Sequence, residues 1–312
     1  MRRILFFAVA LVCCAQEPPD IKVDVGLVTV ATSVSNREGA PVKNLRREDF
    51  ELLDDGKPRE VQYFWQETDL PLTIGLIADV SGSQMGEISK HREDLTRFLA
   101  QVMSPRDRAF LVTVGGQVKL VTDLTSSIEE LSAGVDGIEL RRGAGTQLGE
   151  PCGRRRRGCG TPLWDGIFAA ARLKMRPLSG RKALIVLSDG LDAGSSRNLT
   201  DAIEAAQSAD TLVYTIRSFG MIARFSPMTR IRATVSNPMR RLSAETGGKA
   251  FSSPPDPTAI FAEIADDLRN LYVLGFTPPE AARDGKFHKL EVKIPKTGGT
   301  IRARKGYTAQ LR

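Results

Sequence analysis

Residues 74–86 have the sequence IGLIADVSGSQMG, and this stretch decides the fold. A continuous apolar run ends at Asp79, and Ser81 and Ser83 follow at intervals of two residues. A short apolar run bounded by turn residues is typical of a strand buried on both faces. The next residues, 86–102, place their apolar side chains on one helical face. The carboxylate and both hydroxyls are therefore expected on a strand-to-helix turn, at the edge where open α/β sheets bind ligands.

Two distant residues extend this motif: Thr161 in GCGTPLWDG and Asp189 in ALIVLSDGLD. Asp-x-Ser-x-Ser, then a threonine and an aspartate in this order, resembles the metal-ion-dependent adhesion site of von Willebrand factor type A domains. The resemblance covers roughly residues 70 to 272. The chain also resembles a bacterial exported family of von Willebrand factor A-related proteins, which share segments like EDFELLDDGKP, LPLTIGLIADVSGS and LYVLGF…DGKFHKLEVKI…RARKGY.

From Pro71 onward, predicted strands alternate with predicted helices. This order indicates an α/β fold, a doubly wound and mostly parallel sheet covered on both faces. Strands are expected at 72–78, 109–114, 118–121, 183–188, 211–217 and 270–276, and helices at 86–102, 127–138, 162–174, 199–209, 239–246 and 257–270.

Both ends of the chain have β patterns instead. In the N-terminal part, Asp55–Gly56 separates two short alternating runs, which is a strong hairpin pattern. Neither terminal piece could bury much surface alone, so we expect them to form one small β-sandwich that flanks the α/β domain. The expected division is a signal peptide at 1–15, an N-terminal β lobe at 16–68, the von Willebrand factor A domain at 69–276, and C-terminal strands at 277–312 that pack with the N-terminal lobe.

The first residues, MRRILFFAVALVCCA, combine two arginines, an apolar segment and small residues. This pattern predicts a secretory signal peptide, too short to span a membrane, and a periplasmic or extracellular location. The alternative is a lipoprotein acylated at Cys13 or Cys14, although the residues before them fit a lipobox poorly. No other segment of the sequence predicts a transmembrane helix.

The net charge of +7 is compatible with anionic partners. Nucleic acid is not expected as a partner, because the chain is predicted to be exported and no basic groove with interleaved aromatic residues is visible.

Hydroxyl and carboxylate groups are hard oxygen ligands, which suit Mg²⁺ and also Mn²⁺ or Ca²⁺ better than zinc. The resemblance implies that Ser81, Ser83 and Thr161 approach the ion, while Asp79 and Asp189 act largely through bound water. Neutral hydroxyl ligands leave the charge of the cation poorly offset, so the cation would attract one more ligand. An Asp or Glu carboxylate of a partner protein would supply it.

Structural explanations of the same residues stay open. Asp79, Ser81 and Ser83 could cap the following helix, and Asp189 could belong to a simple turn. A degenerate domain could also bind its partner without metal. Each residue alone favours such an explanation, whereas the complete set in the order of the family favours a metal site.

Catalysis has little support in the sequence. The motif at Asp79 lacks the second acid of an Asp-x-Asp phosphatase, and no Gly-x-Ser-x-Gly elbow or phosphate-binding loop is present. The only histidines, His91 and His288, are expected at the surface. We therefore expect no enzymatic activity.

Cys152 and Cys159 bracket four arginines, Arg154–Arg157, directly before Thr161. In an exported protein this pair predicts a disulfide that closes a small loop. The arginines could form a basic rim beside the metal site, or simply a solvated loop.

The sequence thus predicts an exported, non-enzymatic, metal-dependent binding module. The alternatives are an accessory subunit of an enzyme or secretion assembly, and a metal-free structural protein of the cell envelope.

Overall fold

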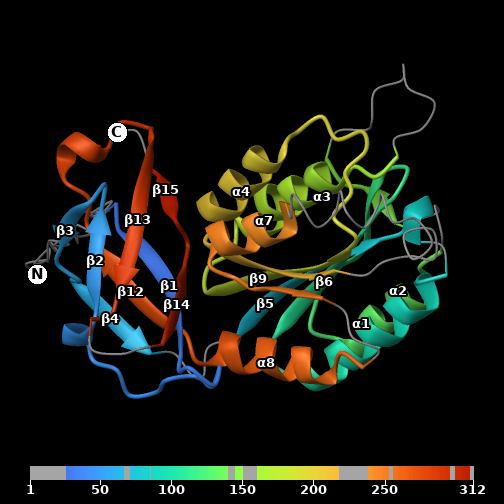
Figure 1. The fold of residues 1–312 in the computed structure, drawn as a ribbon. Helices are drawn as coiled ribbons and strands as arrows, with labels where there is room; N and C mark the ends of the chain where they lie inside the picture. The colour runs from blue at the N-terminus through green and yellow to red at the C-terminus, as the bar shows by residue number, and fades with distance from the viewer. Residues whose placement is uncertain are drawn as a thin grey trace, which may run out of the picture.

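The chain forms an α/β unit and a β-sandwich that lie side by side (Figure 1). The computed structural model describes residues 26–66, 71–84, 86–139, 145–149, 160–217, 238–252, 256–295 and 299–309. Among these residues, no helix is both long and apolar enough to cross a membrane.

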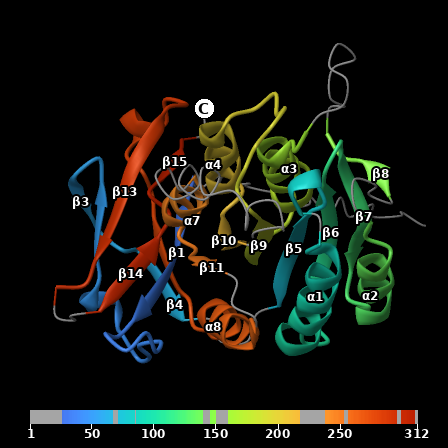
Figure 2. The same cartoon turned by 45° about the vertical axis from the view of Figure 1, so that its right-hand side comes forward.

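The α/β unit is built on a seven-stranded sheet with the order β11-β10-β9-β5-β6-β7-β8. Strands β11 through β6 are parallel to one another, whereas β7 and β8 are antiparallel additions at the edge farthest from the sandwich (Figure 2). The bounds are β5 (Leu72–Asp79), β6 (Arg108–Val114), β7 (Val118–Thr125), β8 (Thr146–Gln147), β9 (Arg181–Ser188), β10 (Thr211–Arg217) and β11 (Ala250–Ser252). The doubly wound, mostly parallel sheet that the sequence predicts is therefore confirmed.

Helices cover both faces of this sheet. One face is covered by α1 (Ile88–Val102), α2 (Ile128–Asp136) and α8 (Thr258–Arg269). The other is covered by α3 (Leu163–Ala169), which continues as a π-helix over Ala170–Met175, by α4 (Leu199–Ser208) and by α7 (Pro238–Thr246). Helix α4 begins at a capping box, because the Asn198 side chain accepts from the backbone N–H of Asp201 while the Asp201 carboxylate accepts from that of Asn198.

Strand β5 is buried along its whole length. Its alternate residues, such as Ile74 and Leu76, join the core beneath α1, α2 and α8, while Ile77 joins the core on the opposite face. This burial on both faces explains why the strand is an unbroken apolar run instead of an alternating one. The core thus holds the end of β5, and Asp79 with it, in a fixed position.

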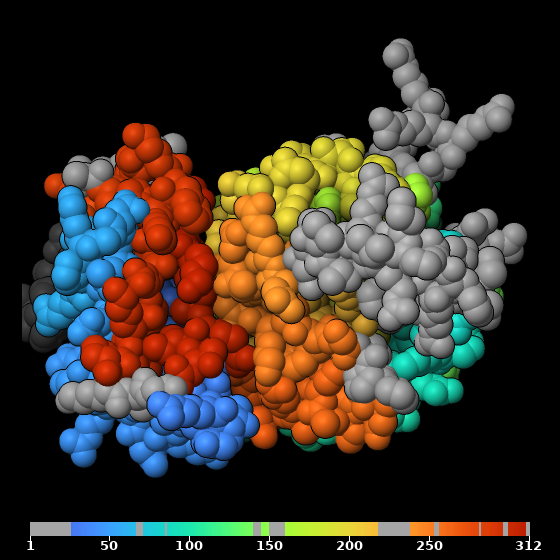
Figure 3. All heavy atoms as spheres, viewed as in Figure 1, coloured from blue at the N-terminus to red at the C-terminus, as the bar shows by residue number. Residues whose placement is uncertain are grey.

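The sandwich is formed by strands from both ends of the chain, which appear as the blue and red lobe in Figure 3. Its two four-stranded sheets have the orders β14-β1-β12-β4 and β15-β13-β2-β3. The bounds are β1 (Val28–Ser35), β2 (Glu51–Asp54), β3 (Lys57–Arg59), β4 (Tyr63–Gln66), β12 (Tyr272–Phe276), β13 (Phe287–Lys293), β14 (Thr300–Ala303) and β15 (Gly306–Thr308). Short 3-10 helices lie at Arg47–Asp49, Gly82–Gln84 and Glu280–Ala282.

The predicted hairpin at Asp55–Gly56 is confirmed, because it joins β2 to β3 with positive φ angles of 51° and 75°. One other expectation is wrong. The strand predicted at 270–276 does not belong to the parallel sheet: β12 lies between β1 and β4 in the sandwich and is antiparallel to both. A short apolar run looks the same in the sequence whether it fills the centre of a parallel sheet or the core of a sandwich.

Candidate metal centre

The candidate centre lies at the carboxyl edge of the parallel sheet, beyond the ends of β5 and β9. These two strands are neighbours, with Ala78 in register with Leu187. Asp79, the last residue of β5, therefore ends up next to Ser188 and Asp189 at the end of β9. The sheet itself brings together residues that are far apart in the sequence.

Asp79 is completely buried, and both of its carboxylate oxygens accept hydrogen bonds. The backbone N–H of Ser81 donates to Oδ1 at 2.9 Å, and the hydroxyl of Ser188 donates to Oδ2 at 2.6 Å. The hydroxyls of Ser81 and Ser83 lie 3.0 Å apart, at the entry to the 3-10 turn that leads into α1. Asp79 thus fixes the turn that carries both serines.

Asp189 is 2% exposed and has one oxygen to spare. Its Oδ1 accepts from the backbone N–H of Leu191 at 2.9 Å, whereas its Oδ2 is buried with no hydrogen-bond partner among the described residues. The side chains of Ser83 and Gln84 approach the carboxylate closely enough to favour its charged form. A buried acceptor without a partner is costly, and a bound ion or its water would remove that cost.

Thr161 reaches the same edge from a third turn. It forms an isolated bridge with Ala193, in which the two backbone N–H groups donate to the opposite carbonyls at 2.7 and 2.9 Å. The loop that follows Asp189 also contacts the start of α3, because the Asp192 carboxylate in this loop accepts from the backbone N–H of Leu163. Thr161 is therefore held against the loop that follows Asp189, and it is 6% exposed.

The two buried carboxylates at this edge of the sheet favour the binding of a cation. Burial and the neighbouring carboxylate of Asp189 raise the pKa of Asp79 to about 7, despite the hydrogen bonds from Ser188 and Ser81. Burial likewise raises the pKa of Asp189. Two buried carboxylates close together oppose each other's ionisation, and a divalent cation between them would remove that opposition. All the side-chain donors are hard oxygens, so the residues present fit Mg²⁺, Mn²⁺ or Ca²⁺.

Three further residues support the centre, and no sequence motif predicts them. Ser188 donates to Asp79, Gln84 is buried beside Asp189, and His91 is buried beside Asp79; Gln84 and His91 are 0% and 1% exposed. His91 was expected at the surface, and this expectation is wrong, because the first turn of α1 places its ring where it donates a hydrogen bond to the backbone carbonyl of Asp79. Burial lowers the pKa of His91 to about 4, so it is a neutral packing residue near neutral pH. A serine or histidine alone carries no sequence pattern that would reveal such a role.

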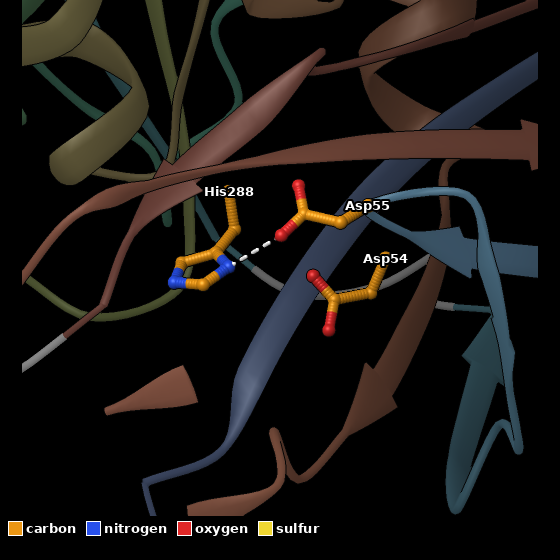
Figure 4. A group of neighbouring side chains, drawn as sticks. All are labelled: Asp54, Asp55 and His288. Atoms are coloured by element: carbon orange, nitrogen blue, oxygen red, sulfur yellow. Dashed lines mark hydrogen bonds and ion pairs between the residues drawn. The ribbon is translucent and has the colours of Figure 1, made fainter. Parts of the chain in front are cut away.

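A second cluster of possible ligands lies in the sandwich, formed by Asp54, Asp55 and His288 (Figure 4). Its atoms already have protein partners. The Nδ1 of His288 lies 2.8 Å from Asp55 and its Nε2 lies 3.1 Å from Asp284, while Asp54 is paired with Arg59 at 3.0 Å. His288 is 8% exposed, so its expected surface position is also wrong. A metal here would have to displace these partners, which makes this cluster the weaker of the two candidates.

Several predicted features lie outside the described residues. These are the signal peptide at 1–15 with Cys13 and Cys14, the Cys152–Cys159 pair, and the arginines 154–157 between them. They stay predictions.

No protein-family model matches the chain, and no curated protein matches it. The solved structures that it resembles include the conserved hypothetical protein BatB from Bacteroides thetaiotaomicron, at 15% identity, over 64% of this chain and 100% of that one, with a TM-score of 0.47. They also include an aerotolerance-related membrane protein from Bacteroides fragilis, at 13% identity, over 63% and 98%, with a TM-score of 0.44. A third is proximal thread matrix protein 1 from the mussel byssus with a zinc-occupied MIDAS motif, at 11% identity, over 69% and 49%, with a TM-score of 0.47.

Proposed function

We propose that this chain is an exported, non-enzymatic binding module of the von Willebrand factor A type. In this proposal it docks an acidic side chain of a partner protein onto a divalent cation. One observation carries the proposal: two buried carboxylates, Asp79 and Asp189, meet at the carboxyl edge of the sheet, and Oδ2 of Asp189 accepts no hydrogen bond of ordinary geometry in the described chain. Mg²⁺ is the ion we favour, because small hydroxyl and water ligands suit its octahedral geometry.

In this proposal the hydroxyls of Ser81, Ser83 and Thr161 would bind the ion, and the carboxylates of Asp79 and Asp189 would orient its water ligands. Ser81 and Ser83 already lie 3.0 Å apart, so they could share one ion without rearrangement of the turn. The cation would supply an open position for a carboxylate from the partner. The protein's own residues would fix where that position points.

The first experiment asks where a divalent ion binds. Thermal unfolding is measured with and without Mg²⁺ or Mn²⁺, for the native chain, for Asp79→Ala and for Asp55→Ala. An ion at one hundred times its Kd stabilises the native state by about 2.7 kcal/mol. We expect that gain in the native chain and in Asp55→Ala, which disables the second cluster, and no gain in Asp79→Ala. A gain that Asp55→Ala abolishes and Asp79→Ala preserves would overturn the proposed site.

The second experiment asks whether docking depends on the ion. The immobilised chain is exposed to an envelope extract, with and without a chelator, beside Asp79→Ala and Asp55→Ala. We expect partner proteins to be retained by the native chain and by Asp55→Ala, and lost with chelator or with Asp79→Ala. If the same partner proteins are retained in the presence of chelator and by Asp79→Ala, the metal-free structural role would be favoured instead.

The proposal also includes oxidation of Cys152 and Cys159 to a disulfide in the exported protein. Thiol alkylation and mass spectrometry without reduction test it directly. Two alkylated cysteines in protein recovered from the envelope would overturn this part of the proposal and leave the metal site untouched.

A further inference from the structure

A cavity of about 530 Å³ lies where the sandwich meets the α/β unit. It is lined on one side by residues of β1, β4 and β12, and on the other by the loop before β9 and the starts of β9 and β10. It therefore lies at the amino edge of the parallel sheet, opposite the edge that carries Asp79. Its volume falls within the range of about 300–1,000 Å³ that is typical of small-molecule sites.

The charged residues of the cavity wall are mostly basic. Arg176, Arg181 and Lys182 line it, and among the described lining residues Asp210 is the only acid. Asp210 is already engaged, because its carboxylate lies 2.8 Å from Nη1 of Arg304 and accepts from the hydroxyl of Thr29 at 3.1 Å. The cavity therefore presents a positive potential that its own acid does not neutralise.

Lys182 shows this imbalance most clearly. It is 7% exposed, and its ammonium group donates to the carbonyl of Leu178 at 2.7 Å, but it forms no ion pair within the described part of the chain. Lysines are almost never this buried without a paired acid. Burial lowers the pKa of Lys182, and Asp210 only partly counteracts this effect. An anion in the cavity would supply the partner that the fold leaves out.

The opposite wall is apolar and includes Trp65, Leu271 and Val273. The indole Nε1–H of Trp65 is buried and has no hydrogen-bond acceptor among the described residues. Because this N–H has almost no accessible surface, a ligand in the cavity does not reach it, and Trp65 contributes only apolar ring surface to the wall. The combination of a cationic end and an apolar wall fits a ligand with one acidic group on an apolar body.

We propose that this cavity binds a small organic anion, with its carboxylate against Lys182 and its apolar body along Trp65, Leu271 and Val273. The site is separate from the candidate metal centre and does not depend on it. Because the cavity wall includes both β1 and β9, a bound ligand would contact both parts of the chain.

Octanoate is the probe that tests this proposal, with octanol and acetate as matched compounds that lack the charge or the apolar body. The chain has two tryptophans, so the Trp164→Phe chain reports on Trp65 alone. We expect octanoate to change the Trp65 fluorescence saturably. Octanol and acetate should each need at least about tenfold higher concentrations, because each lacks one half of the recognised chemistry.

Two variants locate the binding. Lys182→Met keeps the length of the side chain and removes its charge, so octanoate affinity should fall at least about tenfold. Ala31→Leu adds three carbon atoms to a residue of the cavity wall and should also reduce octanoate affinity, without any change of charge. Lys289→Met, on the exposed face of β13, serves as the control with unchanged affinity.

Three results would overturn the proposal: no saturable response to octanoate, equal affinity for octanol, or full affinity in both Lys182→Met and Ala31→Leu. Octanoate binding should persist in Asp79→Ala, so failure of the metal site and failure of this cavity can be told apart.

Discussion

The guanidinium of Arg302, on β14 of the sandwich, lies 2.6 Å from the carboxylate of Asp267 on α8 of the α/β unit. Both side chains are largely buried, 17% and 7% exposed. Ser33 and Tyr214 also donate to this carboxylate, and Arg302 donates to Ser33 at 2.8 Å. A single buried acid therefore joins the sandwich strands β1 and β14 to a helix and a strand of the α/β unit.

Arg302→Met should be strongly destabilising. It leaves the carboxylate of Asp267 buried without its charged partner, and the loss of one member of a buried pair typically costs about 3–5 kcal/mol. Urea unfolding measures the change. Arg47→Met is the control, because the Arg47–Glu48 pair is exposed on both sides and should contribute at most about 1 kcal/mol. Equal effects of the two substitutions would mean that the buried pair does not join the two units.

Deletion of residues 277–312 should destabilise the hairpin at Asp55–Gly56. The deletion removes β13, which pairs with β2 on the side opposite β3, and a lone two-stranded hairpin is at best marginally stable in water. Hydrogen exchange of the β2 amides should become fast, while the β5 amides provide the internal reference. Unchanged protection of β2 after the deletion would show that the N-terminal lobe is independent of the C-terminal strands.

Gly75→Ala should destabilise the α/β core by overpacking it. A Cβ at this position would lie 2.5 Å from both Leu184 and Phe110, which are fully buried. Extra carbon in a well-packed core typically costs about 1–3 kcal/mol. Gly137→Ala is the matched control, since its nearest contacts would be at an ordinary 3.5 Å and its φ of −76° suits alanine. Denaturant unfolding should separate the two, and similar midpoints would refute tight packing around Gly75.

The stability of the sandwich should depend on pH through His288. Burial lowers the pKa of His288, but hydrogen bonds to Asp55 and Asp284 and their charges outweigh it, so the pKa is raised above 6.5. Its contribution to stability is therefore fully present below the unfolded pKa of about 6.5 and is lost as the pH rises through the folded value. The pKa values of Asp55 and Asp284 are lowered, so the carboxylates stay charged throughout this window.

Urea unfolding of the native chain and of His288→Gln at pH 6 and pH 8 checks this dependence. The stability difference between the two chains should be larger at pH 6 than at pH 8. NMR gives the pKa directly, because the only other histidine, His91, has its pKa lowered to about 4 by burial and does not titrate in this range. A His288 pKa at or below 6.5 would contradict the paired geometry.

The sequence predicts most of the α/β fold because local pattern and burial agree there. The predicted strands at 72–78 and 183–188 are confirmed almost to the residue, since buried parallel strands are long apolar runs. The motif residues lie where the ends of such strands must meet. In contrast, β11 has only three residues, too few for a periodic pattern, and β12 is an apolar run that fits either sheet.

Contacts between distant segments could not be predicted. Arg302 pairs with Asp267, and Ser188 donates to Asp79. In neither case does the local sequence around one residue indicate the other residue as its partner. The burial of His288 likewise arises only when the hairpin at Asp55 folds against β13. The contacts of such residues can be recognised only when the strand order, which places them side by side, is known.

Ser188→Ala should weaken metal binding without removing the site. The hydroxyl of Ser188 donates to Oδ2 of Asp79 at 2.6 Å and fixes the carboxylate that we expect to orient the ion's water ligands. Loss of such a supporting partner typically costs about 10–100-fold in metal affinity.

Mn²⁺ titration of Ser188→Ala, followed by electron paramagnetic resonance, measures this loss of affinity directly. Ser243→Ala is the matched control: Ser243 on α7 is equally buried and bonds to Thr215 at 3.1 Å, and no hydrogen bond in the described part of the chain joins its side chain to the five site residues. Ser188→Ala loses two buried hydrogen bonds, because the Ser188 hydroxyl also accepts from the backbone N–H of Gly190 at 3.1 Å, whereas Ser243→Ala loses one. At about 1 kcal/mol for each bond, both variants should be destabilised, Ser188→Ala the more. Only Ser188→Ala should lose Mn²⁺ affinity, and an equal affinity in the two variants would show that the Ser188 hydroxyl does not support the ion through Asp79.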